Sequence, residues 1–487
     1  MAAELNNGST NNMERSHGEE LRDLGKTTEM TQDPSDPENA PVKWSHSWNF
    51  TFSSLGYTIG FGNVLRFPYL AYKNGGGSFL IPYAIMLFLV GLPLFFIEII
   101  IGQYNYKGPT RAFKKIAPIT KGIGYAMVFI TCSIGVCFNV LIAWAIRYWF
   151  SGMATEIPWL NKETNWSTDY ENWTTVVYFN KTIGLGDGSI NSSQFLGMNW
   201  EIVGCLFASC SVVCACCIFG VRYIGRALYF TVPYPYVVLV IMFIWSLTLE
   251  GSGEGILYFL VPADPMQLLD PYTWSVAASQ VLYSLSIGAG GLTSLSMHND
   301  FNTDCLKTSM IICLVDSLTS IFAGFIIFAV LGNISHSLHN GSASREEFDL
   351  MMRHNETRGY WEGPGLAYIA YPMTLQGTSP GVPQLWSFLF FLMLIALGLD
   401  NTFVFVDTIS TAIEENFKCV RRNNRDFSQK MQFSDASLNL PKLIHKIILL
   451  SKFPSYGFNI TEIIIQAHAG GRHHLHYEFH TGPFHGD

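Results

Sequence analysis

The sequence predicts an all-α protein that crosses a membrane several times. Only 14% of its 487 residues are charged and 49% are hydrophobic, whereas soluble domains average about 25% charged residues. The mean hydropathy is +0.23. Four long runs contain no Asp, Glu, Lys or Arg: 78–97, 122–146, 202–221 and 227–249. Each is about 20 residues or longer, enough for a helix to cross about 30 Å of hydrocarbon.

Four further apolar stretches bring the predicted transmembrane helices to eight. They lie near 47–72, 271–297, 308–332 and 384–413. The first 40 residues are polar and lack the apolar core of a signal peptide. Residues 1–43 are therefore predicted to be a disordered cytosolic tail.

Loop charge predicts the orientation. The loop 103–121 carries five basic residues and no acid, so it is expected in the cytosol. The loop 151–199 carries five acids and two lysines and is expected outside. It holds four N-glycosylation sequons, at Asn165, Asn172, Asn180 and Asn191. This pattern predicts a plasma-membrane protein with both termini in the cytosol.

The first span contains polar residues and glycines where hydrocarbon is expected. Gly60, Gly62, Asn63 and Arg66 follow one another closely. Such residues are costly at membrane depth unless they line a cavity. A helix broken there frees carbonyl groups for a cation and N–H groups for an anion. Arg66 is either an extracellular gate residue that pairs with a carboxylate or an interfacial arginine that snorkels.

The sixth span repeats this feature. Gly288, Gly290 and Gly291 lie beside Ser284 and Ser286 in the middle of the span. Glycine in a helix interior costs about 1 kcal/mol relative to alanine, so three close together predict a second broken helix. Close helix packing through small residues is the alternative. Breaks in the first and sixth spans fit an inverted repeat of five spans each.

Three acidic residues lie within otherwise apolar spans. Asp316 is the only charge of the seventh span, and Asp400 precedes Asn401 in the eighth. A charge at the centre of a membrane helix costs about 2.5–3.5 kcal/mol, so each needs a cation, a proton or a hydrogen-bonding partner. Side-chain oxygens for a sodium ion are available on four different helices, from Asn63, Ser284, Asp316, Asp400 and Asn401. Glu98, late in the second span, is predicted to serve helix packing or a gate network.

These residues carry a resemblance to a known family. The stretch GNVLRFPYLAYKNGGG, the GIGYA start of the third span, the glycine-broken sixth span and LGLDNTF of the eighth are similar to the sodium- and chloride-dependent neurotransmitter symporters, which have the bacterial leucine-transporter fold. The resemblance extends from about Trp44 to Phe427.

The resemblance implies ion and substrate sites. It places one sodium ion at the Thr58 carbonyl, Asn63, Ser284 and Asp316, and a second at Gly56, Ile59, Leu397, Asp400 and Asn401. It places chloride at Tyr83, Gln280, Ser284 and Ser320. It lines the substrate pocket with Tyr57, Gly60, Ile134, Phe138, Tyr283, Ser286, Ala289 and Phe405.

The residue at position 60 separates branches of this family. Amine transporters carry Asp there, and amino-acid transporters carry Gly, as this chain does. A substrate carboxylate would then meet a sodium ion and the N–H groups of the half-helix. Gly60 therefore predicts an amino-acid-like substrate.

Several residues depart from the family pattern. Phe138 replaces a tyrosine that bonds the substrate carboxylate, and Asp316 replaces an asparagine. The charge of Asp316 is expected to strengthen cation binding and to disfavour chloride. Ala289 replaces an aromatic residue, which predicts a roomier pocket. Pro41 replaces a cytosolic-gate arginine, although Glu415 supplies an acid for such a gate, and the large loop lacks the family's cysteine pair.

The last 60 residues do not resemble the family. A transporter domain is predicted over 44–427, with eight of the family's twelve helices, followed by a divergent, disordered cytosolic tail over 428–487. The helix that would supply an acid opposite Arg66 is then absent.

The sequence thus predicts a sodium-coupled, chloride-linked symporter of neutral amino acids or amino-acid neurotransmitters that works by alternating access. The alternative is a non-transporting variant that associates with a full-length transporter or with a second copy. No enzyme motif or nucleic-acid-binding pattern is present, and the expected partners are the substrate and the lipid bilayer.

Overall fold

The computed structural model describes residues 43–44, 47–160, 174–183, 199–218, 229–261, 265–338, 364–375 and 382–416. All of them belong to one compact unit that begins at Lys43. Both predicted tails lie outside the described residues apart from Lys43, as do Asn165, Asn172, Asn191 and Pro41.

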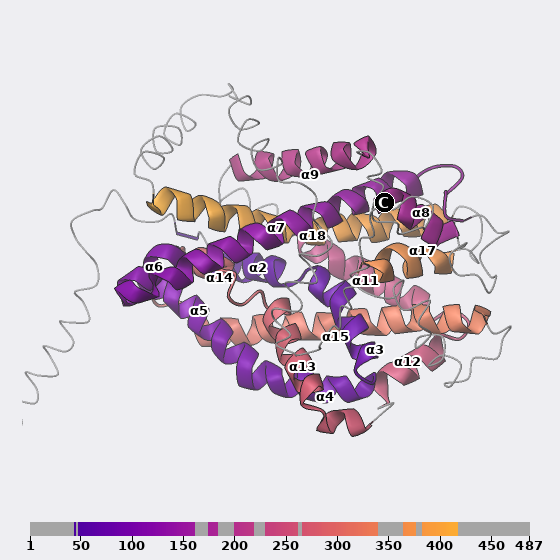
Figure 1. The fold of residues 1–487 in the computed structure, drawn as a ribbon, viewed down its shortest axis with the longest axis horizontal. Helices are drawn as coiled ribbons and strands as arrows, with labels where there is room; N and C mark the ends of the chain where they lie inside the picture. Colours follow the sequence, from indigo (N-terminus) through magenta and orange to yellow (C-terminus); the bar gives the residue numbers. More distant parts are fainter. Residues whose placement is uncertain are drawn as a thin grey trace, which may run out of the picture. The chain divides into compact units, whose positions relative to one another are not determined.

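The described residues form helices and no β-strand (Figure 1). The first three predicted spans correspond to α2 (Ser47–Thr58), η2 (Gly62–Arg66) and α3 (Phe67–Lys73); to α4 (Gly77–Met86), η3 (Leu87–Gly91) and α5 (Leu92–Asn105); and to α7 (Lys121–Gly152). The next five correspond to α9 (Trp200–Ile218); α11 (Pro233–Ser246); α13 (Pro271–Ser284) with α14 (Gly291–Ser296); α15 (Cys305–Leu338); and α18 (Val382–Asn416). The connecting segments hold α6 (Pro109–Ile116), η4 (Pro118–Thr120), α8 (Thr174–Ile183), α12 (Ser252–Leu260), η6 (Pro265–Leu269), η7 (Leu366–Ala370) and α17 (Tyr371–Thr374).

Five helices of the described part are long and apolar enough to cross a membrane. They cover Gly77–Asn105, Pro118–Gly152, Tyr229–Ser246, Cys305–Ser337 and Pro383–Asn416. The other three predicted spans are the shorter α9 and the two broken helices, whose halves are each too short to cross alone. The all-α, multispan prediction is confirmed, whereas the inverted repeat stays a prediction.

Helix ends follow local chemistry. Proline occupies the first turn of α6, α11 and α13, where its missing N–H removes no helical bond. The Asp270 carboxylate accepts a hydrogen bond from the Tyr272 N–H at 2.9 Å and so caps α13.

The two broken helices lie at the centre of the packing. The segment η2 contacts α13 and α15, while α14 packs against α2, α5 and α18. Two of the long helices, α7 and α18, run side by side (Figure 1). Residues from the first, second, sixth, seventh and eighth spans therefore pack around the two breaks.

Candidate ion and substrate site

The first break is a wide turn built around Asn63. The α-helix α2 ends at Thr58, and the chain resumes as the π-helix η2. The Gly60 N–H donates to Asn63 Oδ1 at 3.1 Å. It would otherwise bond the Gly56 carbonyl, so the side chain of Asn63 takes a helical donor away from that carbonyl. Gly56 was predicted to offer this oxygen to the second sodium ion.

The second break unwinds residues 285–290. Ser286, Gly288 and Gly290 have positive φ angles of 53°, 84° and 78°. Serine rarely adopts this conformation, and backbone strain of this kind collects at functional sites. The Gly288 N–H donates to the buried Glu98 carboxylate at 3.0 Å. Glu98 therefore holds the unwound segment, as a residue of a packing or gate network would.

A buried polar cluster joins the two breaks. The Asn63 Nδ2 amide lies 2.8 Å from Asp316 Oδ1, 3.1 Å from Ser284 Oγ and 2.9 Å from Ser320 Oγ. The Ser284 hydroxyl donates to Asp316 Oδ2 at 2.8 Å. All four side chains are almost fully buried. Asn63, Ser284 and Asp316 were predicted as one sodium site, and the structure brings them together.

The Asp316 carboxylate has no Lys or Arg partner within the described residues. The ion pairs found there are Lys43–Asp300 and Arg147–Glu201, both with exposed groups. A buried carboxylate without a countercharge is costly, and a hard cation with oxygen ligands would neutralise it. The donor set of carboxylate, amide and hydroxyl oxygens fits such an ion.

The predicted chloride ligands surround the same cluster. The Tyr83 hydroxyl lies 3.4 Å from Ser317 Oγ, and Gln280 Nε2 donates to the Gly62 carbonyl at 3.2 Å. Ser284 directs its hydroxyl hydrogen to Asp316. That hydrogen is therefore engaged by a carboxylate and not available to an anion.

The predicted second sodium site is less closely assembled. Asp400 is buried, and its Oδ1 has no hydrogen-bond partner in the described part of the chain. The Asn401 Nδ2 amide donates to the Leu397 carbonyl at 3.1 Å. Ile59 of this second site and Thr58, whose carbonyl was predicted for the first site, are both buried next to the first break.

A cavity of about 290 Å³ adjoins the cluster and the two breaks. Seven of the eight predicted substrate residues lie at its wall: Gly60, Ile134, Phe138, Tyr283, Ser286, Ala289 and Phe405. Tyr57 differs from the prediction, because its fully buried ring lies behind the wall against Phe405, at 5.8 Å between centroids. The phenyl ring of Phe138 packs on Phe405 at 5.4 Å.

The cavity also has wall residues that the sequence did not reveal. Ser275 and Ser279 lie two turns and one turn before Tyr283 on α13. The spacing of four residues would have placed them on the face of Tyr283. Asn401, predicted for a sodium ion, lines the substrate cavity as well.

The two predicted gate residues have different partners. The Arg66 guanidinium lies 4.4 Å from the centre of the Tyr283 ring, a cation–π contact at the cavity wall. Glu415 accepts hydrogen bonds from the Gly108 N–H at 2.8 Å and from the Thr110 hydroxyl at 3.3 Å. Both carboxylate oxygens of Glu415 thus bind the start of α6, and its role in a gate stays a prediction.

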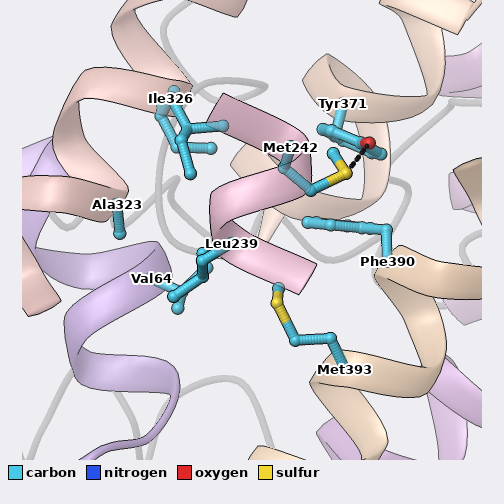
Figure 2. Close-up of a pocket in the computed structure, with 9 residues that line it drawn as sticks. Val64, Leu239, Met242, Ala323, Ile326, Tyr371, Phe390 and Met393 are labelled. Carbon is cyan, nitrogen blue, oxygen red and sulfur yellow. Dashed lines mark hydrogen bonds between the residues drawn. The ribbon is translucent and has the colours of Figure 1, made fainter. Parts of the chain in front are cut away.

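A second cavity, shown in Figure 2, is much smaller and apolar. Its volume is about 10 Å³, and the hydrogen bond drawn there runs from the Tyr371 hydroxyl to Met242 Sδ at 2.9 Å. It touches η2 through Val64. A space of this size holds no amino acid, so of these two cavities in the described part of the chain the larger one is the candidate substrate site.

The fold and site define a multispan membrane protein with two broken helices around a buried polar cluster. A family model, described as the sodium:neurotransmitter symporter family, matches residues 42–440, which extends past Phe427. The chain therefore belongs to this family of symporters.

Curated relatives agree with this assignment. The sodium- and chloride-dependent neutral and basic amino acid transporter B(0+) of Homo sapiens is 36% identical over 426 residues, which cover 78% of this chain and 64% of the relative. The sodium- and chloride-dependent GABA transporter 2 of Rattus norvegicus is 38% identical over 404 residues, covering 79% and 64%. The sodium- and chloride-dependent glycine transporter 1 of Xenopus laevis is 38% identical over 405 residues, covering 76% and 60%. The chain thus spans less than two thirds of the length of these relatives.

Proposed function

We propose that this protein couples the uptake of a neutral amino acid, or an amino-acid neurotransmitter, to the sodium gradient across the plasma membrane. The observation that carries the proposal is the buried cluster of Asn63, Ser284 and Asp316, which joins both helix breaks beside the 290 Å³ cavity. A cation held at this cluster would touch the two segments that form the cavity. Cation and substrate binding would then depend on each other.

The cavity supports a small neutral substrate. Its volume lies at the lower end of the range for ligand pockets, about 300–1,000 Å³. The described residues at its wall include no acidic side chain that would pair with a basic substrate. Gly60 leaves no carboxylate for an amine, and this supports a substrate that brings its own carboxylate.

The cluster supports strong sodium dependence and weak chloride dependence. Asp316 places a fixed negative charge among the predicted chloride ligands and accepts the hydrogen of the Ser284 hydroxyl. An anion nearby would meet repulsion and lose a donor. The second sodium ion is proposed at Asp400 with the Gly56 carbonyl.

Transport would proceed by alternating access. The half-helices α2 and α14 contact each other, and η2 contacts α3 and α13. Movement of the halves about residues 59–61 and 285–290 would open the cavity to one side of the membrane at a time. The cytosolic location of both termini belongs to the same proposal.

Uptake into proteoliposomes tests the proposal. The purified chain is reconstituted, and the uptake of radiolabelled neutral amino acids is followed with an inward sodium gradient and with an equal choline gradient. Accumulation that needs sodium is expected. Equal entry in the two gradients would overturn the proposal.

The same measurement tests the second candidate function, in which the chain does not transport but changes the activity of another transporter. Co-reconstitution with a full-length relative would change the uptake by that relative. Sodium-driven accumulation by this chain alone excludes a purely modifying role.

A further inference from the structure

Asn401 occupies an unusual position in the cavity wall. It lies on α18 one turn before Phe405, and both line the cavity with Gly60 and Phe138. Its side chain is only 2% exposed in the folded chain. It is therefore a fixed amide at the point where the first helix breaks.

One of the two Asn401 amide hydrogens has an assigned acceptor. The Nδ2 atom donates to the Leu397 carbonyl at 3.1 Å. A primary amide has two N–H donors, and no second acceptor for Nδ2 lies within the described residues. A buried donor without an acceptor is costly, which points to a ligand that supplies one.

The amide lies directly over Gly60. A Cβ atom built on Gly60 would overlap Asn401 Nδ2, and Oδ1 would lie 3.5 Å from it. The side chain of Asn401 therefore fills the space that any side chain at position 60 would need. The Leu397 bond restrains the amide from swinging away.

Two other donors for a substrate carboxylate are missing from this wall. Phe138 carries no hydroxyl, and its ring is enclosed by Phe61 and Phe405 at 5.3 and 5.4 Å between centroids. The Gly60 N–H is already bound to Asn63 Oδ1. The free Asn401 N–H is a donor at the wall that can replace them.

We propose that Asn401 binds the carboxylate of the transported amino acid through its free amide hydrogen, and that Asn401 and Gly60 form a matched pair that selects carboxylate-bearing substrates. The proposal rests on the proposed function. It extends that function by naming the group that recognises the substrate carboxylate.

Substituting Asn401→Asp tests the donor role. Aspartate keeps the size and an oxygen for a cation but loses the N–H donor and adds a repelling charge. We expect binding of the amino acid to weaken by about tenfold to hundredfold, the effect of one charge-assisted hydrogen bond. With the amino acid held far below saturation, so that its occupancy does not draw sodium onto the protein, the sodium concentration for half-maximal binding should not rise. Binding is measured with radiolabelled amino acid on the reconstituted chain.

Thr402→Val is the matched control. The Thr402 hydroxyl is equally buried and donates to the Gly398 carbonyl at 2.8 Å, but the residue does not line the cavity. Its loss should leave the substrate affinity within about twofold. Unchanged amino-acid affinity in Asn401→Asp would overturn the proposal, as would a parallel loss of sodium and substrate affinity.

The steric half of the pair is tested separately. Gly60→Ala should abolish binding because its Cβ overlaps the Asn401 amide, and the double variant Gly60→Ala with Asn401→Ser should recover part of it. Normal binding by Gly60→Ala alone would overturn the matched pair. A wild-type chain that binds no amino acid would refute the proposed function, whereas normal wild-type binding with unaffected variants would refute only the role of Asn401.

Discussion

At the residue scale, the Asp316 carboxylate organises the site. Its Oδ1 accepts from Asn63 and its Oδ2 accepts from Ser284, so one acid connects the first, sixth and seventh spans. Buried charges are strongly destabilising when a partner is removed. Substitutions of Asp316 or of its hydrogen-bond partners should therefore change the affinity for the bound ion.

Replacing Asn63 by alanine should greatly weaken sodium binding. The substitution removes the amide that binds Asp316, Ser284 and Ser320 and the oxygen that holds the Gly60 N–H. Hydrogen bonds to charged groups contribute about 1.5–3 kcal/mol each, so half-saturation should need at least about tenfold more sodium. Sodium titrations of amino-acid binding measure this shift.

Asn105→Ala is the control for that variant. Asn105 is also buried, but its amide donates to the Ile101 carbonyl of its own helix, at 2.9 Å. It should leave the sodium titration unchanged. A normal sodium response in Asn63→Ala would contradict the assignment of this site.

Replacing Asp316 by asparagine should make the protein more dependent on chloride. The neutral amide removes the charge that repels an anion near Ser284 and Ser320. Unit charges a few ångströms apart interact with several kcal/mol at an effective dielectric constant of about 20, so the apparent chloride affinity should rise at least about tenfold. Uptake in chloride and in gluconate is compared. A chloride curve that does not move would count against this role of the charge.

The sequence anticipated some of these residues and not others. Asn63, Ser284 and Asp316 could be predicted because polar groups at membrane depth need each other or an ion. Glu415 and Tyr57 were placed differently because the direction of a side chain depends on neighbours far away in the chain. Asn401 contacts Gly60, 341 positions earlier in the sequence, and no local pattern reveals that contact.

At the element scale, the start of the first span is fastened to the end of α14. The Lys43 ammonium lies 2.7 Å from the Asp300 carboxylate. The Trp44 N–H and indole donate to the His298 and Leu295 carbonyls, at 3.0 and 3.1 Å. The hydrogen bond to Asp300 raises the pKa of Lys43, so the Lys43 ammonium stays protonated through the neutral range. These contacts hold α2 near α14, with which it packs.

Breaking the Lys43–Asp300 pair should favour separation of α2 from α14. The pair is exposed, and such pairs contribute about 0–1 kcal/mol, so the closed state should lose at most about fivefold in population. The measurement is the rate at which a maleimide modifies a cysteine introduced by Ser54→Cys, at a buried position on α2. Lys43→Ala should raise the rate, and the swap Lys43→Asp with Asp300→Lys should restore it.

The Arg147–Glu201 pair provides the control. Its atoms lie 2.6 Å apart between α7 and α9, away from both breaks. Glu201→Gln should not change the modification rate. An unchanged rate in Lys43→Ala, or an equal rise in Glu201→Gln, would contradict the fastening.

The sequence predicted the positions of the helix breaks but not the type of each helix. Both breaks were predicted, because glycines and polar residues interrupt apolar runs. The π-helices η2 and η3 were not, since their width depends on bonds between residues five apart and not on composition. In η2 the Phe67 N–H donates to the Gly62 carbonyl, five residues earlier. No sequence pattern distinguishes a helix with such a bond from an ordinary α-helix.

At the scale of the whole molecule, charge and apolar surface define an orientation in the membrane. The segment of α6 and η4 carries basic side chains, and Ile119 at its end is highly exposed. The helix α8 belongs to the loop with the sequons, and Asn180 is half-buried on it. Exposed apolar side chains such as Phe88, Leu89 and Val237 suit contact with lipid. The two connecting segments should therefore face opposite sides of the membrane.

Glycan mapping tests this orientation. Glycans are attached only on the lumenal side of the secretory membranes. Replacing asparagine by glutamine at the four sequons of the loop 151–199, and at the other Asn-X-Ser/Thr sites of the chain, should therefore abolish the shift in gel mobility that a glycosidase causes. These other sites are Asn7, Asn49, Asn333, Asn340, Asn355 and Asn459. In that background, Pro118→Asn creates an Asn-Ile-Thr sequon at η4, where Pro118 is exposed. The new site should stay unmodified if the basic loop lies in the cytosol, as its charge predicts. A glycan at position 118 in this variant, with none on the four sequons of the loop 151–199 in the parent chain, would show that the chain is inverted, and Glu415 and the start of α6 would then face the exterior.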